Sequence, residues 1–105
     1  MAVNPGDGGT ATSTAGAAEI DHNSGTITTE ALTTAAGATY TMTVTNANME
    51  SNSVVAVAVA LGTATTGTPC VTTVTPAAGS VVIVLQNIHA TAALNGTLKI
   101  RFGKV

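Results

Sequence analysis

The stretch from Thr39 to Thr45 alternates strictly between threonine and a larger side chain, in the order Thr-Tyr-Thr-Met-Thr-Val-Thr. Successive side chains of a β-strand point to opposite faces of the sheet. The pattern therefore places Tyr40, Met42 and Val44 on one face and the threonines on the other. This period of two is typical of a strand that covers a hydrophobic core with one face only, and a helix would scatter the same residues around its surface.

Further segments show strand patterns and are separated by turn residues. Residues 97–105 also alternate, with Leu98, Ile100 and Phe102 expected to point inward. Residues 53–61 and 80–86 are apolar on both faces, which predicts strands that are central in a sheet or covered by a partner subunit. Shorter strands are expected at 19–22, 26–32 and 69–75, and turns at Ala35–Gly37, Ala77–Gly79 and Asn95–Gly96.

The composition favours the same fold class. Thr, Ala and Val dominate, and only 8% of the residues are charged, so strong helix formers are scarce and β-branched residues abundant. Roughly six to eight short antiparallel strands predict one all-β domain, a β-sandwich or jelly roll, over residues 19–105. Residues 1–18 are rich in glycine and small side chains, so we expect an extended N-terminal arm that a neighbouring molecule holds in place.

The charge pattern argues against several partners. The net charge is -2, and the basic residues are Lys99, Arg101 and Lys104. Nucleic-acid binding needs a clustered basic face, so we expect no nucleic-acid partner. Three positive charges can still form ion pairs with an acidic partner surface. The longest apolar run, 54–61, is too short to cross a membrane as a helix, and residues 1–9 lack the basic and apolar regions of a secretory signal.

Few side chains could bind a metal or act as acid and base. Asp21, His22 and Asn23 are the only cluster of potential ligands, but neighbouring strand residues point to opposite faces, and we interpret them as a strand end with an Asx turn. His89 could pair with Glu30 or Asp21, yet no nucleophile motif accompanies it. We expect His89 to hydrogen-bond the backbone in a loop or to lie at a subunit contact.

The remaining motifs have structural interpretations. Cys70 is the single cysteine, which excludes an intrachain disulfide, and we expect it in the core. Asn95-Gly96-Thr97 matches the glycosylation sequon, but turn formation accounts for it. The threonine row of 39–45 could bind ice only if a repeat multiplied it, and the sequence has no such repeat. We therefore predict that the protein is not an enzyme and has no catalytic residue, cofactor, metal or small-molecule substrate.

Bulky apolar side chains are few for a chain of this length, and neither a disulfide nor a metal motif adds stability. Small domains of this kind are often stabilised by oligomerisation. We therefore expect a homo-oligomer.

Three stretches together resemble a known family. They are TTEALTTAAGATYTMTVTN (28–46), TGTPCVTTVTPAAGSVVIVLQN (66–87) and HATAALNGTLKIRF (89–102). They resemble small proteins encoded near the head genes of tailed bacteriophages, which are capsid decoration (cement) proteins. The resemblance covers residues 26–103 and matches the arm least.

The resemblance implies a β-sandwich or jelly roll, often trimeric, on the outer capsid surface of the virion. Its partner would be the major capsid protein, whose neighbouring subunits it clamps, and the family has no catalytic residues to carry over. The alternative is another virion part, such as a head fibre, a tail or baseplate module, or an adhesin that binds a host surface or glycan. Glycan sites usually present aromatic platforms, and the core pattern already uses Tyr40.

Overall fold

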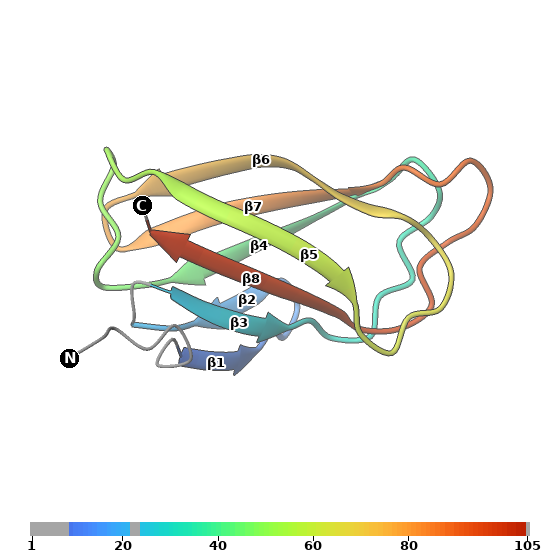
Figure 1. The fold of residues 1–105 in the computed structure, drawn as a ribbon, viewed down its shortest axis with the longest axis horizontal. Coiled ribbons are helices and arrows are strands. Elements are labelled where there is room, and N and C mark those ends of the chain that lie inside the picture. Colours follow the sequence, from blue (N-terminus) through green and yellow to red (C-terminus); the bar gives the residue numbers. More distant parts are fainter. Residues whose placement is uncertain (1–8, 22–23, 105) are drawn as a thin grey trace.

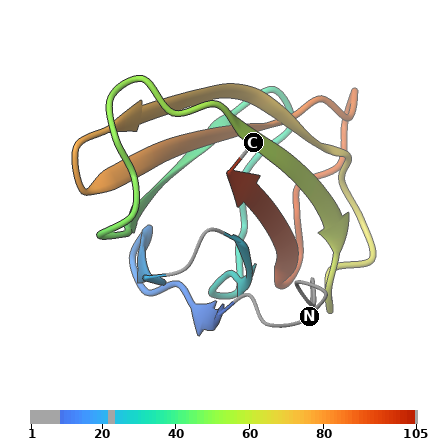
Figure 2. The same ribbon diagram turned by 60° about the vertical axis from the view of Figure 1, so that its left-hand side comes forward.

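A computed structural model of the chain describes residues 9–21 and 24–104. These residues form eight strands and no helix: β1 (Gly9–Thr12), β2 (Ala17–Glu19), β3 (Ser24–Thr28), β4 (Thr39–Thr45), β5 (Val55–Leu61), β6 (Pro69–Ala77), β7 (Ser80–Asn87) and β8 (Leu98–Lys104). Sheet A has the order β1-β3-β8-β5, and sheet B has the order β2-β4-β7-β6. The two sheets pack against each other (Figure 1; Figure 2). The predicted all-β sandwich is confirmed.

Both sheets are mixed. β1 pairs with β3 and β2 pairs with β4 in parallel, while the other neighbouring strands of both sheets run antiparallel. The parallel pairs arise because the chain changes sheet between β1 and β2 and again between β2 and β3, so these strands are not joined by hairpins within one sheet. In the described residues no helix is long and apolar enough to cross a membrane.

The segment expected as an N-terminal arm, residues 1–18, is described from residue 9 onward. There it forms the edge strands β1 and β2 of the same chain, and β2 continues to Glu19 across the expected boundary. A tight turn connects the two strands, with reciprocal backbone hydrogen bonds of 2.9 and 3.0 Å between Thr14 and Ala17. Its central residues, Ala15 and Gly16, have positive φ angles of 51° and 80°.

The core lies between the two sheets and follows the period-two patterns. Tyr40, Met42 and Val44 face inward from β4, as predicted, with Tyr40 at the margin. The inward residues predicted for the last strand are also buried. The central core side chains, each at most 2% exposed, are Ile27, Met42, Val44, Val81, Ile83, Leu85, Leu98, Ile100 and Phe102.

The two strands with apolar residues on both faces occupy different positions. β7 is central in sheet B, as the pattern indicates. β5 is an edge strand of sheet A, so the expectation that it could be central is wrong. Its valines pack partly against the core, while Ala56, Ala58 and Ala60 are exposed on the outer face. An alanine methyl group is small enough to remain at the surface at little cost, which is why the pattern misleads.

Residues 46–52 form hydrogen-bonded turns, and Met49 within them is buried at 2% exposure. One predicted turn differs from the structure. Asn95–Gly96 does not form a hairpin turn, because Gly96 is not among the glycines with positive φ. Gly96 instead allows close chain approach: a Cβ atom there would lie 2.6 Å from Thr63 Oγ1. The Asn95 side chain accepts hydrogen bonds from the backbone N–H groups of the loop at Thr65 and Thr66.

Candidate functional site

The candidate metal ligands do not converge in the part of the chain that the structure describes. Asp21 lies just after β2, and its Oδ1 accepts a hydrogen bond of 2.9 Å from the backbone N–H of Ala47. His22 and Asn23 lie outside the described residues. Among residues 9–21 and 24–104, no group of three His, Cys, Asp or Glu side chains comes together. Asp21 therefore acts here as a turn-stabilising acceptor.

His89 lies in the loop after β7 and hydrogen-bonds backbone groups, as expected. Its Nδ1 accepts from the N–H groups of Thr91 and Ala92, at 3.0 and 2.9 Å. Its own N–H donates to Asn87 Oδ1 at 3.1 Å. Because this ring nitrogen accepts hydrogen bonds from two backbone donors, the side chain organises the loop.

Cys70 is not in the core, contrary to the prediction. It lies on β6 opposite Gln86 and is partly exposed on the outer face of sheet B. The register of β6 shifts between Val71 and Thr73. Before that bulge, Val71 faces inward opposite the buried Leu85, and alternation turns Cys70 outward.

One polar cluster was not predicted. Glu30, after β3, accepts hydrogen bonds at Oε1 from the hydroxyls of Ser13 and Tyr40, the latter at 2.8 Å. Its Oε2 accepts from the N–H of Gly16 at 3.0 Å. Ser13 is 1% exposed and its hydroxyl also lies 3.0 Å from that of Tyr40. The carboxylate thus binds the β1–β2 turn to the body of the sandwich.

Burial and hydrogen bonding together set the pKa values of Glu30 and Tyr40. Desolvation by itself would raise the pKa of Glu30, but the hydrogen bonds from Ser13, Tyr40 and the backbone outweigh it and hold that pKa below its usual value of 4.5. Desolvation, together with the Glu30 charge, raises the pKa of Tyr40 to about 12. The neutral phenol and the charged carboxylate therefore favour each other. Both Glu30 oxygens are occupied by donors from the chain itself, so the cluster is structural.

The outer face of sheet A carries Lys99 and Arg101. Cross-strand rows run Thr10–Thr26–Arg101–Ala58 and Thr12–Thr28–Lys99–Ala60. Lys99 and Arg101 are exposed, and no strand of sheet A carries an acidic residue. The positive charge of this face therefore lies on β8, between the threonines of β1 and β3 on one side and the alanines of β5 on the other.

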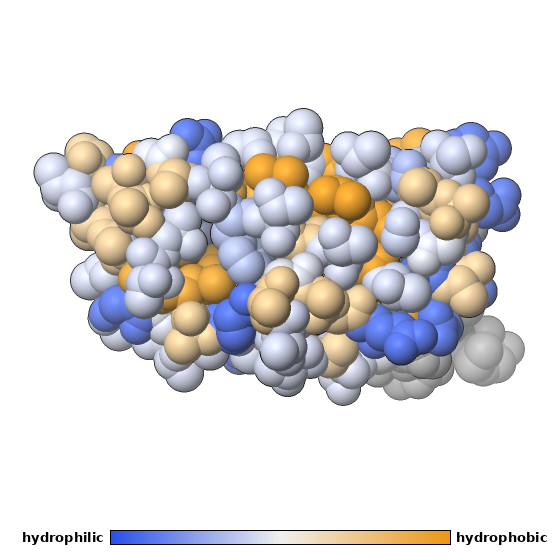
Figure 3. All heavy atoms as spheres, turned by 180° about the vertical axis from the view of Figure 1, so that it is seen from behind, coloured by the Kyte–Doolittle hydropathy of each residue, from blue (hydrophilic) through white to orange (hydrophobic). Residues whose placement is uncertain are grey.

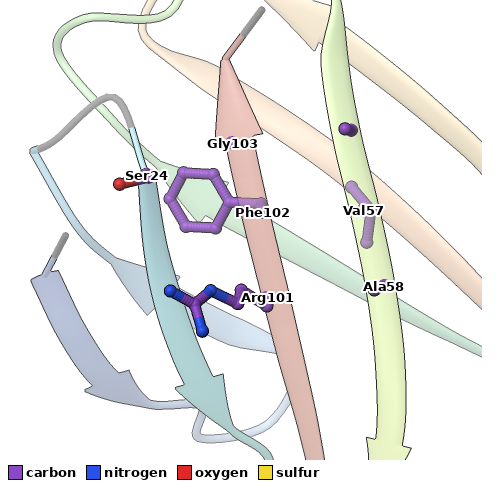
Figure 4. A pocket seen from close by; sticks show the side chains of 7 residues that line it. Ser24, Val57, Ala58, Arg101, Phe102 and Gly103 are labelled. Carbon is purple, nitrogen blue, oxygen red and sulfur yellow. The ribbon is translucent and has the colours of Figure 1, made fainter. Parts of the chain in front are cut away.

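Two shallow hollows lie on this face, where Gly103 has no side chain and the β5 alanines have only a methyl group to fill the space. One, of about 330 Å³, is lined by Ser24, Ala56, Val57, Ala58, Arg101, Phe102 and Gly103 (Figure 4). The other, of about 300 Å³, is lined by Thr26, Ala58, Val59, Ala60, Lys99, Ile100 and Arg101. Ala58 and Arg101 line both. In Figure 4 the Arg101 side chain leans over β3, away from β5.

The outer face of sheet B differs in chemistry. The threonines of β4 are exposed there, in register with the partly buried Val82 and Val84 of β7 and with Thr73 and Thr75 of β6. Seen from behind, this side is largely pale with orange patches toward its middle (Figure 3). It is a weakly polar surface.

Comparisons with protein-family models, curated proteins and solved structures gave no match. The functional proposal therefore depends on the surfaces of the sandwich.

Proposed function

We propose that the protein is a capsid decoration protein, which binds the outer surface of a phage head and stabilises contacts between major capsid subunits. The observation that carries the proposal is the outer face of sheet A. It combines two exposed cations, two hollows and an apolar edge strand, β5, in a chain whose charged groups are otherwise few. Such a face suits contact with a protein surface more than catalysis.

The edge strand adds to this support. Of the three large apolar side chains that are exposed among the described residues, two flank or end β5: Val54 at 65% and Leu61 at 42% exposure. They lie at the two ends of the edge strand and add exposed apolar surface to both ends of this edge. A decoration protein repeats such contacts over a whole shell, so that weak single contacts give strong total binding.

The aromatic residues weigh against a glycan-binding adhesin. The chain has one tyrosine and one phenylalanine and no tryptophan. Phe102 is 1% exposed, and Tyr40 packs against the core with its hydroxyl bound to Glu30. Neither ring is available as a stacking platform for a sugar. A head-fibre, tail or baseplate module remains the second candidate, and the test below separates it from the first.

The test compares virions made with and without this chain. We expect the protein, a trimer in solution by light scattering, to co-sediment with heads and to raise the temperature at which they release DNA. Imaging the two virion forms would locate its density on the head surface. Density at the tail or baseplate would support the second candidate, and a strict monomer that never co-sediments with heads would refute the first.

A further inference from the structure

We propose that the β5 edge of sheet A accepts an added β-strand from an acidic protein partner. The strand would be extended, would pair with Val57–Leu61, and would carry carboxylates at alternate positions that face Lys99 and Arg101. The inference rests on the proposed function only for the source of the strand, which would then be the capsid protein. Strand addition combines backbone hydrogen bonds for affinity with side-chain contacts for specificity.

The free backbone groups of β5 can be assigned from its pairing with β8. Gly62 donates its N–H to Thr97 at 2.9 Å, which makes this a hydrogen-bonded pair of the antiparallel ladder. Hydrogen-bonded and non-hydrogen-bonded pairs alternate, so Ala58 and Ala60 direct their backbone groups toward β8. Val57, Val59 and Leu61 direct theirs to the open edge, where no hydrogen bond to β6 is present.

The other three edges are protected in ways that β5 is not. β1 and β2 have four and three residues. β6 contains Pro69 and Pro76, which lack an N–H, and a bulge between them. β5 has seven residues, no proline, no charge and no register shift. Natural proteins commonly protect exposed edge strands from pairing with prolines, bulges, charges or short length. An edge strand with none of these features is therefore expected to pair with a strand of another molecule when the protein functions.

The edge is accessible along its second half. β5 starts beside β6 at the seam between the sheets and then diverges from it toward Leu61 (Figure 1; Figure 2). Ala56, Ala58 and Ala60 are exposed next to the edge, and Leu61 is 42% exposed. An added strand can therefore lie along residues 57–61 without displacing β6.

Charge complementarity selects an acidic partner. Arg101 is in register with Ala58, and Lys99 with Ala60. A residue on the added strand opposite Ala58 would lie two strand spacings, about 10 Å, from Arg101. The Lys99 side chain and a glutamate on the added strand can together span this distance, because the alanines of β5 do not block it. Arg101, which leans over β3 (Figure 4), has to turn toward β5 to reach the added strand. Carboxylates two residues apart would meet both cations.

A second copy of the chain is a poorer occupant. Antiparallel self-pairing of β5 would match valines with valines and alanines with alanines, but β5 offers no carboxylate. It would also place Lys99 and Arg101 of both copies on one continuous sheet face, where like charges repel. The partner strand therefore comes from a different, acidic protein.

The probe is a fluorescein-labelled peptide, Thr-Val-Glu-Val-Glu-Val-Thr, and the matched control has lysine in place of both glutamates. We expect the intact protein to bind the glutamate peptide at least about tenfold more tightly in fluorescence anisotropy, and the preference to shrink with added salt. Binding should slow the hydrogen exchange of the Val57 and Val59 amides. The double variant Lys99→Glu and Arg101→Glu should reverse the preference between the two peptides.

Equal affinity for both peptides, or binding that leaves the Val57 and Val59 amides unprotected, would overturn the proposal. So would concentration-dependent protection of these amides without peptide, because a second copy would then occupy the edge. Head binding distinguishes this inference from the proposed function. If the double variant co-sediments with heads as well as the wild type does, the strand assignment fails while the decoration role stands. If the protein binds the peptide as expected but does not co-sediment with heads, the decoration role fails while the strand assignment stands.

Discussion

β5 and β6 are both edge strands beside the same seam of the sandwich, and they are built in opposite ways. β6 carries two prolines and a bulge over nine residues, whereas β5 is an unbroken seven-residue run of valine, alanine and leucine. The neighbouring strands differ too: β7 presents Val82 and Val84 beside β6, while β8 presents Lys99 and Arg101 beside β5. One edge is closed to pairing, and the other combines free backbone groups with nearby charge.

This difference shows that edge strands are under a constraint that central strands do not have. The two sheets contribute similar aliphatic side chains to one shared core. Their edges must each solve the problem of unpaired backbone groups, and only one of the four lacks a protective device.

The largest expected effects test whether the sheets are equivalent in the core. Ile100→Ala in sheet A and Ile83→Ala in sheet B each remove a fully buried side chain. Each should lower the free energy of unfolding by about 2–5 kcal/mol, because burial is lost and a cavity remains. Urea denaturation should show one transition for both variants. A loss confined to one variant would mean that the sheets differ in the core as well as at the edges.

The next prediction concerns the short edges β1 and β2. Glu30→Gln keeps the side-chain shape but removes the charge that binds Ser13, Tyr40 and Gly16. It should cost about 1–3 kcal/mol of stability at pH 7 and speed hydrogen exchange in β1 and β2 more than in β5.

The same variant also tests acid sensitivity. The folded-state pKa of Glu30 lies below its usual value of 4.5. The contribution of Glu30 to the free energy of unfolding is therefore present above pH 4.5 and is lost as the pH falls through the folded-state pKa. Wild-type stability should therefore decrease below about pH 4.5 more steeply than that of the variant. Parallel pH profiles would contradict this role of Glu30.

Tyr40→Phe should have a smaller effect, about 1 kcal/mol, from the lost hydroxyl hydrogen bonds. The folded-state pKa of Tyr40 is raised from 10.0 to about 12. Its contribution is therefore complete below pH 10.0 and is lost as pH rises toward 12. Alkaline denaturation profiles should show this loss in the wild type and not in the variant.

Pro76→Val would give β6 an edge N–H and make it more like β5. We expect the free energy of unfolding to change by less than about 1 kcal/mol, with more concentration-dependent self-association than in the wild type. Sedimentation velocity measures this. Unchanged association would show that the proline is not what closes the edge of sheet B.

The smallest effects belong to the outer faces. Thr43→Val on sheet B and Ala58→Thr on sheet A both change exposed strand positions and should alter stability by no more than about 0.5 kcal/mol. The two variants should differ in their affinity for the glutamate peptide, because Ala58 lines both hollows. Ala58→Thr should weaken binding of the glutamate peptide, whereas Thr43→Val should leave it unchanged.

The local patterns of the chain determined the fold class, the strand at 39–45 with its ends and the inward residues of the last strand. These follow from side-chain alternation, which needs only neighbouring residues. Only the tertiary structure decided that β7 is central and β5 an edge, since both sequences are apolar on either face and position in a sheet depends on distant partners. The Glu30 cluster was hidden for the same reason, because its donors Ser13 and Tyr40 lie 17 and 10 residues away.

The cations illustrate the same division. The sequence shows that cations are few and that alanines alternate along 56–60. It does not show that these alanines lie next to Lys99 and Arg101. The register of β5 with β8 set Arg101 against Ala58 and Lys99 against Ala60 at an open edge. Hydrogen bonding between strands far apart in the chain decides such a register.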